Sequence, residues 1–185
     1  VWAVGAQGTI LKWNGTAWMP QASGITTTLN GVWGTGANNV WAVGAGTILR
    51  WNGTAWIAQT SGTPNTLYGV RGSDASNVWA VGEQGTIVKW DGSAWTAQNS
   101  GTMNPLYGVW AADASNVWAV GYNGTIRKWD GKTWTAQNSP FAGFLMSVWG
   151  TASNDVWIVG DVGMVLKWRG SNWSVKSLST ANPLS

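Results

Sequence analysis

The chain has 185 residues and a formal net charge of +3, with 18 Trp, 26 Gly, no Cys and no His. The missing Cys and His exclude disulfides, thiolate and most zinc sites, Ser-His-Asp triads and imidazole pH switches. The ten Lys and Arg residues are spread along the chain, whereas a nucleic-acid surface needs a basic patch or stripe. No apolar run approaches the roughly 18 residues that a membrane helix needs. Composition therefore argues against most enzyme chemistry, against nucleic-acid binding and against a membrane span.

An internal repeat runs through the whole chain. The pentapeptide Val-Trp-(Ala/Ile)-Val-Gly begins at positions 1, 40, 78, 117 and 156, in steps of 39, 38, 39 and 39 residues. We therefore expect a single domain, 1–185, in which every repeat is one structural unit. The repeats cover residues 1–39, 40–77, 78–116, 117–155 and 156–185, the last of them truncated.

Each repeat contains four short apolar segments. In the first complete set they cover residues 29–34, 40–44, 47–51 and 55–59, and we name them strands a, b, c and d. Val, Ile, Thr and Trp dominate these segments, and Gly, Asn and Asp separate them, as strand and turn chemistry requires. Asn14-Gly15 and Asp91-Gly92 lie between a Trp that ends strand c and a Trp that starts strand d. Such dipeptides favour tight hairpins, because both turn residues tolerate positive φ.

Four antiparallel strands in a unit of about 40 residues are typical of a propeller blade. We therefore predict an all-β, five-bladed β-propeller of four-stranded antiparallel blades, with strand a at the axis. Small residues would keep the crowded centre narrow, namely Gly31, Gly69, Gly108 and Ser147.

The number of strands predicts how the ring closes. The chain carries strands b, c and d five times but strand a four times, and its tail at 182–184 aligns with 104–106 at the start of a strand a. We expect this tail to complete one blade beside residues 1–5, joining the termini and giving a closed monomer. If the ring does not close, the chain would be a piece of a larger propeller or part of an oligomer.

All 18 Trp residues fall in four registers, one on each strand, near one axial end of the ring. Because a Trp can bury a large area, we expect roughly three quarters of them to pack between blades. Strand d is outermost, so we expect its Trp residues to be partly exposed and to bind ligand. The predicted ligand-binding residues are Trp18, Trp56, Trp95, Trp134 and Trp173, with Arg71, which replaces a strand-a Trp near the axis.

The remaining polar residues favour structural roles. A Lys or Arg precedes each strand-c Trp; we expect a solvated charge with its stem over the ring, the alternatives being a ligand site or a cation–π pair. Asp74, Asp113 and Asp155 are expected to cap turns rather than to bind calcium. Glu83, the only Glu, lacks the second carboxyl group or base that catalysis would need. We predict no catalytic residue, no metal site and no cofactor.

The motifs Val-Trp-Ala-Val-Gly, Gly-Thr-Ile-x-Lys-Trp and (Asn/Asp)-Gly-x-x-Trp resemble those of short-repeat bacterial β-propellers. They are similar to tectonin- and tachylectin-type lectin repeats, and to Asp-box (BNR-like) and photosystem-II-assembly-factor repeats. Residues 130–134, Asp-Gly-Lys-Thr-Trp, resemble an Asp box without its leading Ser/Thr.

This resemblance, with the near-identical blades, favours a non-catalytic, multivalent carbohydrate-binding propeller that uses Trp-lined clefts between blades. Its partners would be glycans, and its location extracellular or at a bacterial cell surface. The alternative is a recently amplified or engineered repeat scaffold, or a protein-interaction module with a protein partner. A propeller hydrolase is a third hypothesis.

Overall fold

A computed structural model describes residues 1–176, which form five antiparallel sheets. The first sheet has three strands, β1 (Trp2–Val4), β2 (Ile10–Trp13) and β3 (Trp18–Gln21). The second contains β4 (Leu29–Gly36), β5 (Asn39–Gly44), β6 (Thr47–Trp51) and β7 (Trp56–Gln59). The third contains β8 (Leu67–Asp74), β9 (Asn77–Gly82), β10 (Ile87–Trp90) and β11 (Trp95–Gln98).

The last two sheets repeat this pattern. The fourth contains β12 (Leu106–Asp113), β13 (Asn116–Gly121), β14 (Ile126–Trp129) and β15 (Trp134–Gln137). The fifth contains β16 (Leu145–Ala152), β17 (Asp155–Gly160), β18 (Val165–Trp168) and β19 (Trp173–Val175). Short 3-10 turns connect strand b to strand c in four sheets: η1 (Ala6–Gly8), η2 (Glu83–Gly85), η3 (Tyr122–Gly124) and η4 (Asp161–Gly163).

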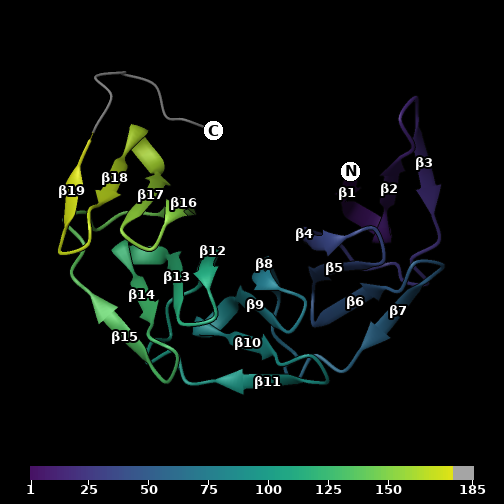
Figure 1. Cartoon of the computed structure of the whole chain (residues 1–185), viewed down its shortest axis with the longest axis horizontal. Helices are drawn as coiled ribbons and strands as arrows, with labels where there is room; N and C mark the ends of the chain where they lie inside the picture. The colour runs from purple at the N-terminus through teal and green to yellow at the C-terminus, as the bar shows by residue number, and fades with distance from the viewer. Residues whose placement is uncertain (177–185) are drawn as a thin grey trace.

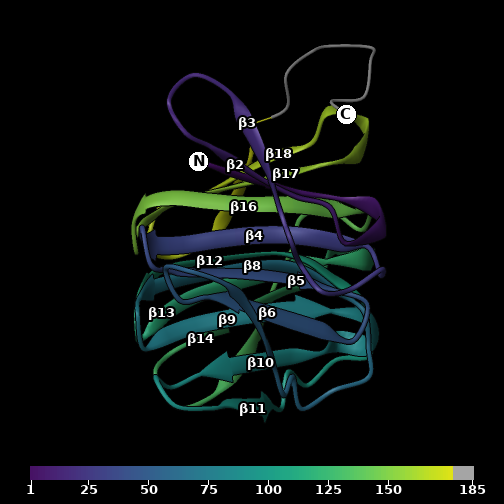
Figure 2. The ribbon, with the colours of Figure 1, turned by 90° about the vertical axis from the view of Figure 1, so that its right-hand side faces the viewer.

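The sheets are arranged radially, with strand a innermost and strand d outermost. The four a strands β4, β8, β12 and β16 contact one another in succession. Figure 1 shows them around the centre, with β7, β11, β15 and β19 at the periphery. Figure 2 shows the same inner strands lying side by side across the molecule. This is the architecture of a β-propeller, so the predicted all-β, five-bladed fold is confirmed.

The a strands approach closely at the small residues identified in the sequence. A Cβ atom at Gly69 would lie 3.0 Å from the backbone oxygen of Tyr107, and one at Gly31 would lie 3.1 Å from that of Tyr68. A Cβ at Gly108 would lie 3.1 Å from the Cα of Ser147. Larger side chains would push these strands apart, so glycine sets the narrow spacing at the axis.

The first and last sheets stand at the two ends of an arc (Figure 1). Among residues 1–176 the first sheet has no strand a, and the tail predicted to supply one, at 182–184, lies outside the described residues. Ring closure and the monomeric state therefore stay predictions. Side chains at the two ends are unusually exposed: Trp13 by 36% and Trp18 by 44% in the first sheet, and Trp149 by 50% in the last.

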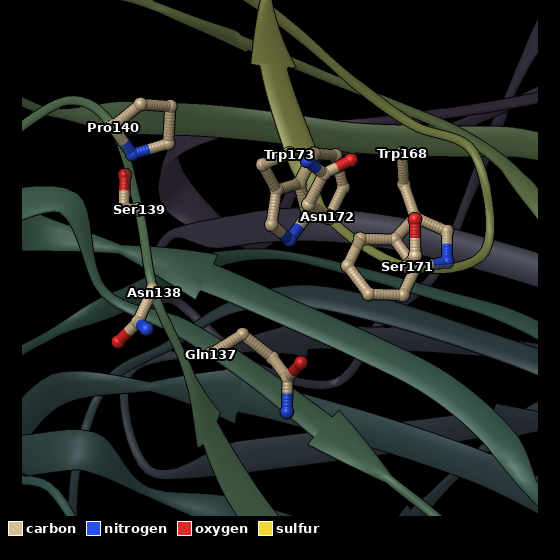
Figure 3. Close-up of a pocket in the computed structure, with 8 residues that line it drawn as sticks. All are labelled: Gln137, Asn138, Ser139, Pro140, Trp168, Ser171, Asn172 and Trp173. Atoms are coloured by element: carbon tan, nitrogen blue, oxygen red, sulfur yellow. The ribbon is translucent and has the colours of Figure 1, made fainter.

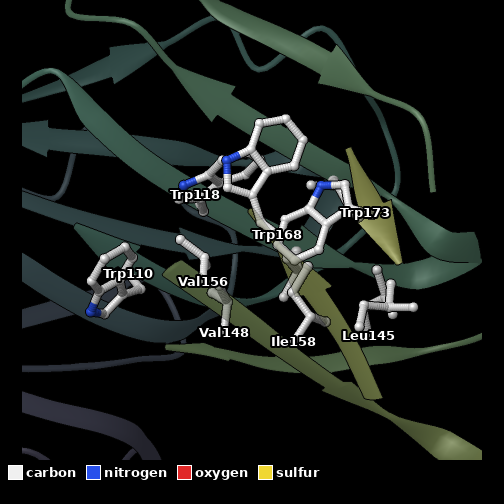
Figure 4. Packing of buried hydrophobic residues seen from close by; sticks show 11 residues of the cluster. Trp110, Trp118, Leu145, Val148, Val156, Ile158, Trp168 and Trp173 are labelled. Carbon is white, nitrogen blue, oxygen red and sulfur yellow. The ribbon is translucent and has the colours of Figure 1, made fainter. Parts of the chain in front are cut away.

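Indole rings and aliphatic side chains fill the space between neighbouring sheets. Trp118 of the fourth sheet is fully buried, with its ring centroid 5.0 Å from that of Trp168 and 5.1 Å from that of Trp173 in the fifth. Val156 and Ile158 of β17 belong to the same cluster, as Figure 4 shows. Twelve of the 18 Trp side chains are buried, which agrees with the expectation that most of them pack between blades.

The hairpins between strands c and d have the predicted turn chemistry. The side-chain oxygen of Asp91 accepts hydrogen bonds from the backbone N–H groups of Ser93 and Ala94, at 2.8 and 2.9 Å, and from the Ser93 hydroxyl. Asn14 and Asn52 accept the equivalent bonds in the first two sheets. The backbone donors of Ala94 and Ser93 lower the pKa of Asp91 to about 2, so the carboxylate is ionised at neutral pH.

Acid should weaken the Asp91 turn. Because the pKa of Asp91 is lower in the folded chain, its contribution to the unfolding free energy is full above about pH 4 and is lost as the pH falls toward 2. Asp91→Asn keeps the acceptor geometry seen at Asn52 and cannot titrate. The urea midpoint of the variant should therefore fall less between pH 7 and about pH 2.5 than that of the parent chain. Parallel decreases would contradict this role.

Candidate binding surfaces

Three similar clefts lie at the outer side of the molecule, each between strand d of one blade and the c–d hairpin of the next. We call them the rim clefts. Each combines the Gln that ends strand d with the two Trp residues of the following hairpin. Their volumes are about 390, 340 and 250 Å³. In that order, the Gln and Trp residues are Gln59 with Trp90 and Trp95, Gln137 with Trp168 and Trp173, and Gln98 with Trp129 and Trp134.

The strand-d Trp residues are more buried than the sequence suggested. Trp56, Trp95, Trp134 and Trp173 are each only 7% exposed, so the prediction that this register is partly exposed is wrong for four of its five members. The cause is packing against the preceding blade: the Trp56 ring lies 5.1 Å from that of Trp2, nearly edge-on. Among the five, Trp18 alone is exposed, at 44%, because no preceding blade covers the first sheet among residues 1–176. Of the buried members, Trp95, Trp134 and Trp173 line the rim clefts.

The indole N–H groups of the cleft Trp residues differ in their hydrogen bonding. In strand c, Trp90 donates to the backbone oxygen of Ala75 at 3.2 Å and Trp129 to that of Ala114 at 3.1 Å, whereas the Trp168 N–H finds no acceptor among residues 1–176. In strand d, the N–H groups of Trp95, Trp134 and Trp173 find no acceptor among residues 1–176. Figure 3 shows the Trp173 nitrogen on the side of the ring toward Gln137. These nitrogens are themselves buried, and the N–H groups of Trp41, Trp79 and Trp118, which line no rim cleft, also find no acceptor among residues 1–176.

The basic residues that precede the strand-c Trp residues lie over indole rings. The Lys12 nitrogen is 5.1 Å from the ring centroids of both Trp2, in its own sheet, and Trp51, in the next sheet. Arg50, Lys89 and Lys128 each bridge two sheets in the same way. Lys167 lies 4.1 Å from the Trp157 ring and pairs with Asp155 at 2.8 Å. The expected solvated charges are therefore corrected to cation–π contacts, and four of the five join two blades.

Arg71 does not lie in a rim cleft. It is half-buried on β8, opposite Trp79 of β9. Because β9 and β10 separate β8 from β11, Arg71 lies on the inner edge strand of the sheet and Trp95 lies on its outer edge strand. The structure thus separates Arg71 from the other predicted ligand-binding residues, and a binding role for any of them stays a prediction.

A row of aromatic side chains lies at the axial end where the a strands begin. The Tyr68 and Tyr107 ring centroids are 5.5 Å apart, Tyr107 and Phe144 are 6.1 Å apart and stacked, and Phe144 and Tyr122 are 5.1 Å apart. We call these four residues the aromatic row. Phe144 is 41% and Tyr122 44% exposed, and Met146, at the strand position of Tyr68 and Tyr107, is 50% exposed. None of these residues was predicted as a site from the sequence.

Carboxylates border the aromatic row. Glu83 accepts the Thr66 backbone N–H at 3.1 Å and the Tyr68 hydroxyl at 3.2 Å, and Asp161 accepts the Phe144 backbone N–H at 3.1 Å. The hydrogen bond from the Thr66 backbone is the main cause that lowers the pKa of Glu83. Burial, followed by the bond to Glu83, raises the pKa of Tyr68. This end of the axis is therefore aromatic and negatively charged at neutral pH.

The acidic residues are dispersed and individually engaged. Asp74 and Asp113 accept the backbone N–H groups of Ser76 and Ser115 at 2.9 and 2.8 Å, which confirms their role in turns. Within residues 1–176, no group of three or more Asp and Glu side chains could hold a metal ion. The same part of the chain contains no helix with the length and apolar character to span a membrane.

The architecture defines a β-propeller, and the comparisons with known proteins support that class. No family model and no curated protein matches the chain. Among solved structures, YCF48 from Cyanidioschyzon merolae is 18% identical, with a TM-score of 0.71 over 92% of this chain and 66% of that one. The RRP9 WD40 repeats are 11% identical, with a TM-score of 0.76 over 99% of this chain and 62% of that one.

A third similar structure is the WD40 propeller domain of Doa1, 16% identical, with a TM-score of 0.66 over 90% of this chain and 56% of that one. The chain thus spans 56–66% of the length of these proteins. At such low identity they show the propeller fold alone. The resemblance to tectonin, tachylectin and Asp-box repeats stays a prediction.

Proposed function

We propose that the chain is a non-catalytic protein-interaction module that binds a peptide segment of a partner protein on the aromatic row. The exposure of Phe144, Tyr122 and Met146 carries this proposal. Tyr, Phe and Met are enriched at the centres of protein interfaces, and a few such side chains often supply most of the binding energy. The rings pack on one another in sequence and form a strip, which suits an extended segment better than an enclosed small molecule.

The propeller frame explains why the strip is available for binding. The Trp residues and cation–π contacts that hold the blades together lie toward the opposite axial end, beside the a–b and c–d turns. The aromatic row stands on β8, β12 and η3 and on the residue before β16, so three blades contribute to one surface. Its side chains can therefore serve recognition without being needed for the main contacts between sheets.

A peptide-display experiment tests this function. A random peptide library selected on the immobilised chain should yield peptides that bind the double variant Phe144→Ser/Tyr122→Ser about tenfold or more weakly, because two anchor rings are removed. The matched control is Met19→Ser/Ile57→Ser, which removes two apolar side chains of β3 and β7, each 46% exposed. Equal binding to both double variants, or no enriched peptide, would reject the aromatic row as a protein-binding surface.

The rim clefts support glycan binding as a second candidate function. Three similar clefts offer an indole wall and a Gln amide, which match the apolar face and the hydroxyls of a sugar. Several weak equivalent sites would add up through avidity. Glycan-array binding that is lost in the triple variant Gln59→Ala/Gln98→Ala/Gln137→Ala would support this function. A parent chain that binds no glycan on a broad array would reject it.

A further inference from the structure

Two carboxylates lie beside the aromatic row. Glu83 of η2 and Asp161 of η4 are fixed by hydrogen bonds from the backbone N–H groups of Thr66 and Phe144, both at 3.1 Å. Asp161 uses one oxygen in that bond, and among residues 1–176 its other oxygen accepts none. The segments that carry the row and its two carboxylates contain no Lys or Arg; they are residues 66–68, 83–85, 105–107, 122–124, 144–146 and 161–163. Arg127 at the start of β14 and Lys176 after β19 lie at the same axial end but outside these segments. An incoming segment therefore meets ring faces and uncompensated carboxylates together.

Six of the ten basic side chains are engaged in other contacts. Five of the ten lie over the indole rings near the c–d hairpins, as described above. Arg127, the basic residue on β14 closest to η3 in sequence, donates to the Gly101 backbone oxygen at 2.7 Å. Five basic side chains are thus gathered toward the opposite axial end, and the two carboxylates next to the row give it a preference for cations.

The shape of the row distinguishes between cations. An ammonium group is best held by rings that surround it, whereas a planar guanidinium can stack on an open ring face and donate to a carboxylate at its edge. Here the rings form an open strip, and Tyr107 and Phe144 are nearly parallel, with 26° between their planes. Glu83 and Asp161 lie beside the strip at separate blades.

Building on the protein-interaction function proposed above, we propose that the partner segment presents an arginine side chain to the aromatic row. Its guanidinium stacks on the rings and donates hydrogen bonds to Glu83 or Asp161, while neighbouring apolar residues of the segment cover Phe144 and Met146. Charge and stacking act together in this arrangement, so replacement of the arginine by lysine preserves the attraction but loses the planar contact.

Synthetic versions of the peptides selected on the parent chain test this inference by calorimetric titration. Peptides that depend on the row should contain arginine, and Arg→Gln should weaken binding by about tenfold or more, Arg→Lys by less. On the protein side, Glu83→Gln/Asp161→Asn should weaken binding to a similar extent and leave the binding of the Arg→Gln peptide nearly unchanged. The matched control is Asp91→Asn/Asp130→Asn, which removes two carboxylates from c–d turns where Asn already occurs in other repeats.

The outcomes separate this inference from the function on which it rests. Peptides that need Phe144 and Tyr122 but bind equally well after Arg→Gln would keep the protein-interaction function and overturn the arginine. Equal binding of the Arg and Lys peptides would overturn guanidinium stacking. Loss of all dependence on Phe144 and Tyr122 would reject both proposals. The Arg→Gln comparison uses the unmodified chain, so it decides the question even if the double carboxylate variant folds poorly.

Discussion

Replacing Trp90 with alanine is expected to lower the free energy of unfolding by about 3–5 kcal/mol. Trp90 is 3% exposed and lies between the second and third sheets, 6.5 Å from the Trp41 ring and 5.9 Å from the Trp95 ring. Truncation would also remove the hydrogen bond to Ala75 and the cation–π contact with Arg50, 5.1 Å from the ring. The rigid strands around the ring would leave a cavity that neighbours cannot fill. Equilibrium unfolding in guanidinium chloride measures the loss.

The chain supplies its own control at the equivalent position of the first sheet. Trp13 has a similar local sequence, with a preceding Lys and a following turn that contains Gly, but Trp13 is 36% exposed. Trp13→Ala should therefore cost less than about 1 kcal/mol. If the two variants lost the same stability, the face of the first sheet that points away from the second sheet would be covered in solution. The pair thus measures burial at constant sequence context.

The comparison of Trp13 with Trp90 also shows how far local sequence can predict this structure. Spacing and turn residues were enough to predict the strands, the radial arrangement and the glycines at Gly31 and Gly69, because these features repeat with every blade. Exposure does not repeat in this way. It depends on whether another sheet lies beside a given blade, and no residue near Trp13 encodes that difference.

The strand-d Trp residues illustrate a second limit. An outermost strand suggests exposure, but neighbouring blades overlap at the c–d hairpins, so the Trp173 ring meets that of Trp118 in the preceding sheet at 5.1 Å. Predicting this contact requires the offset between sheets, which the alternation of side chains along one strand does not contain. The clefts between blades were anticipated, whereas the burial of the rings that line them was not.

The aromatic row could not be read from a repeat motif, because its members occupy positions that differ between repeats. Tyr68 and Tyr107 correspond to Asn30 and Met146, and Tyr122 corresponds to Glu83 and Asp161. The available signal was this variation itself, at the start of strand a and in the b–c turns of otherwise similar repeats. Only the radial arrangement shows that these positions converge at one end of the axis.

Gly121→Ala is expected to destabilise the chain by about 3 kcal/mol or more, because the new methyl group would collide with backbone rather than with a flexible side chain. A Cβ at this position would overlap the backbone oxygen of Pro105 and lie 2.8 Å from the Cα of Leu106. The same oxygen accepts the Tyr122 N–H at 2.9 Å, so relief of the clash would break a contact that holds η3 against the start of β12. Thermal and denaturant unfolding would measure the loss.

Gly5 is the matched control, since it occupies the same repeat position in a sheet without strand a among residues 1–176. A Cβ built there meets no atom within 4 Å, and both glycines have extended backbone, with φ of −172° at Gly5 and −170° at Gly121. Gly5→Ala should therefore leave the unfolding free energy unchanged or raise it by less than about 1 kcal/mol, through the unfolded state. A large loss at Gly5 would mean that an inner strand occupies this place in solution, as the strand predicted at 182–184 would. Loss at Gly121 alone would show that the requirement for glycine comes from the adjacent strand a and not from the conformation of the turn.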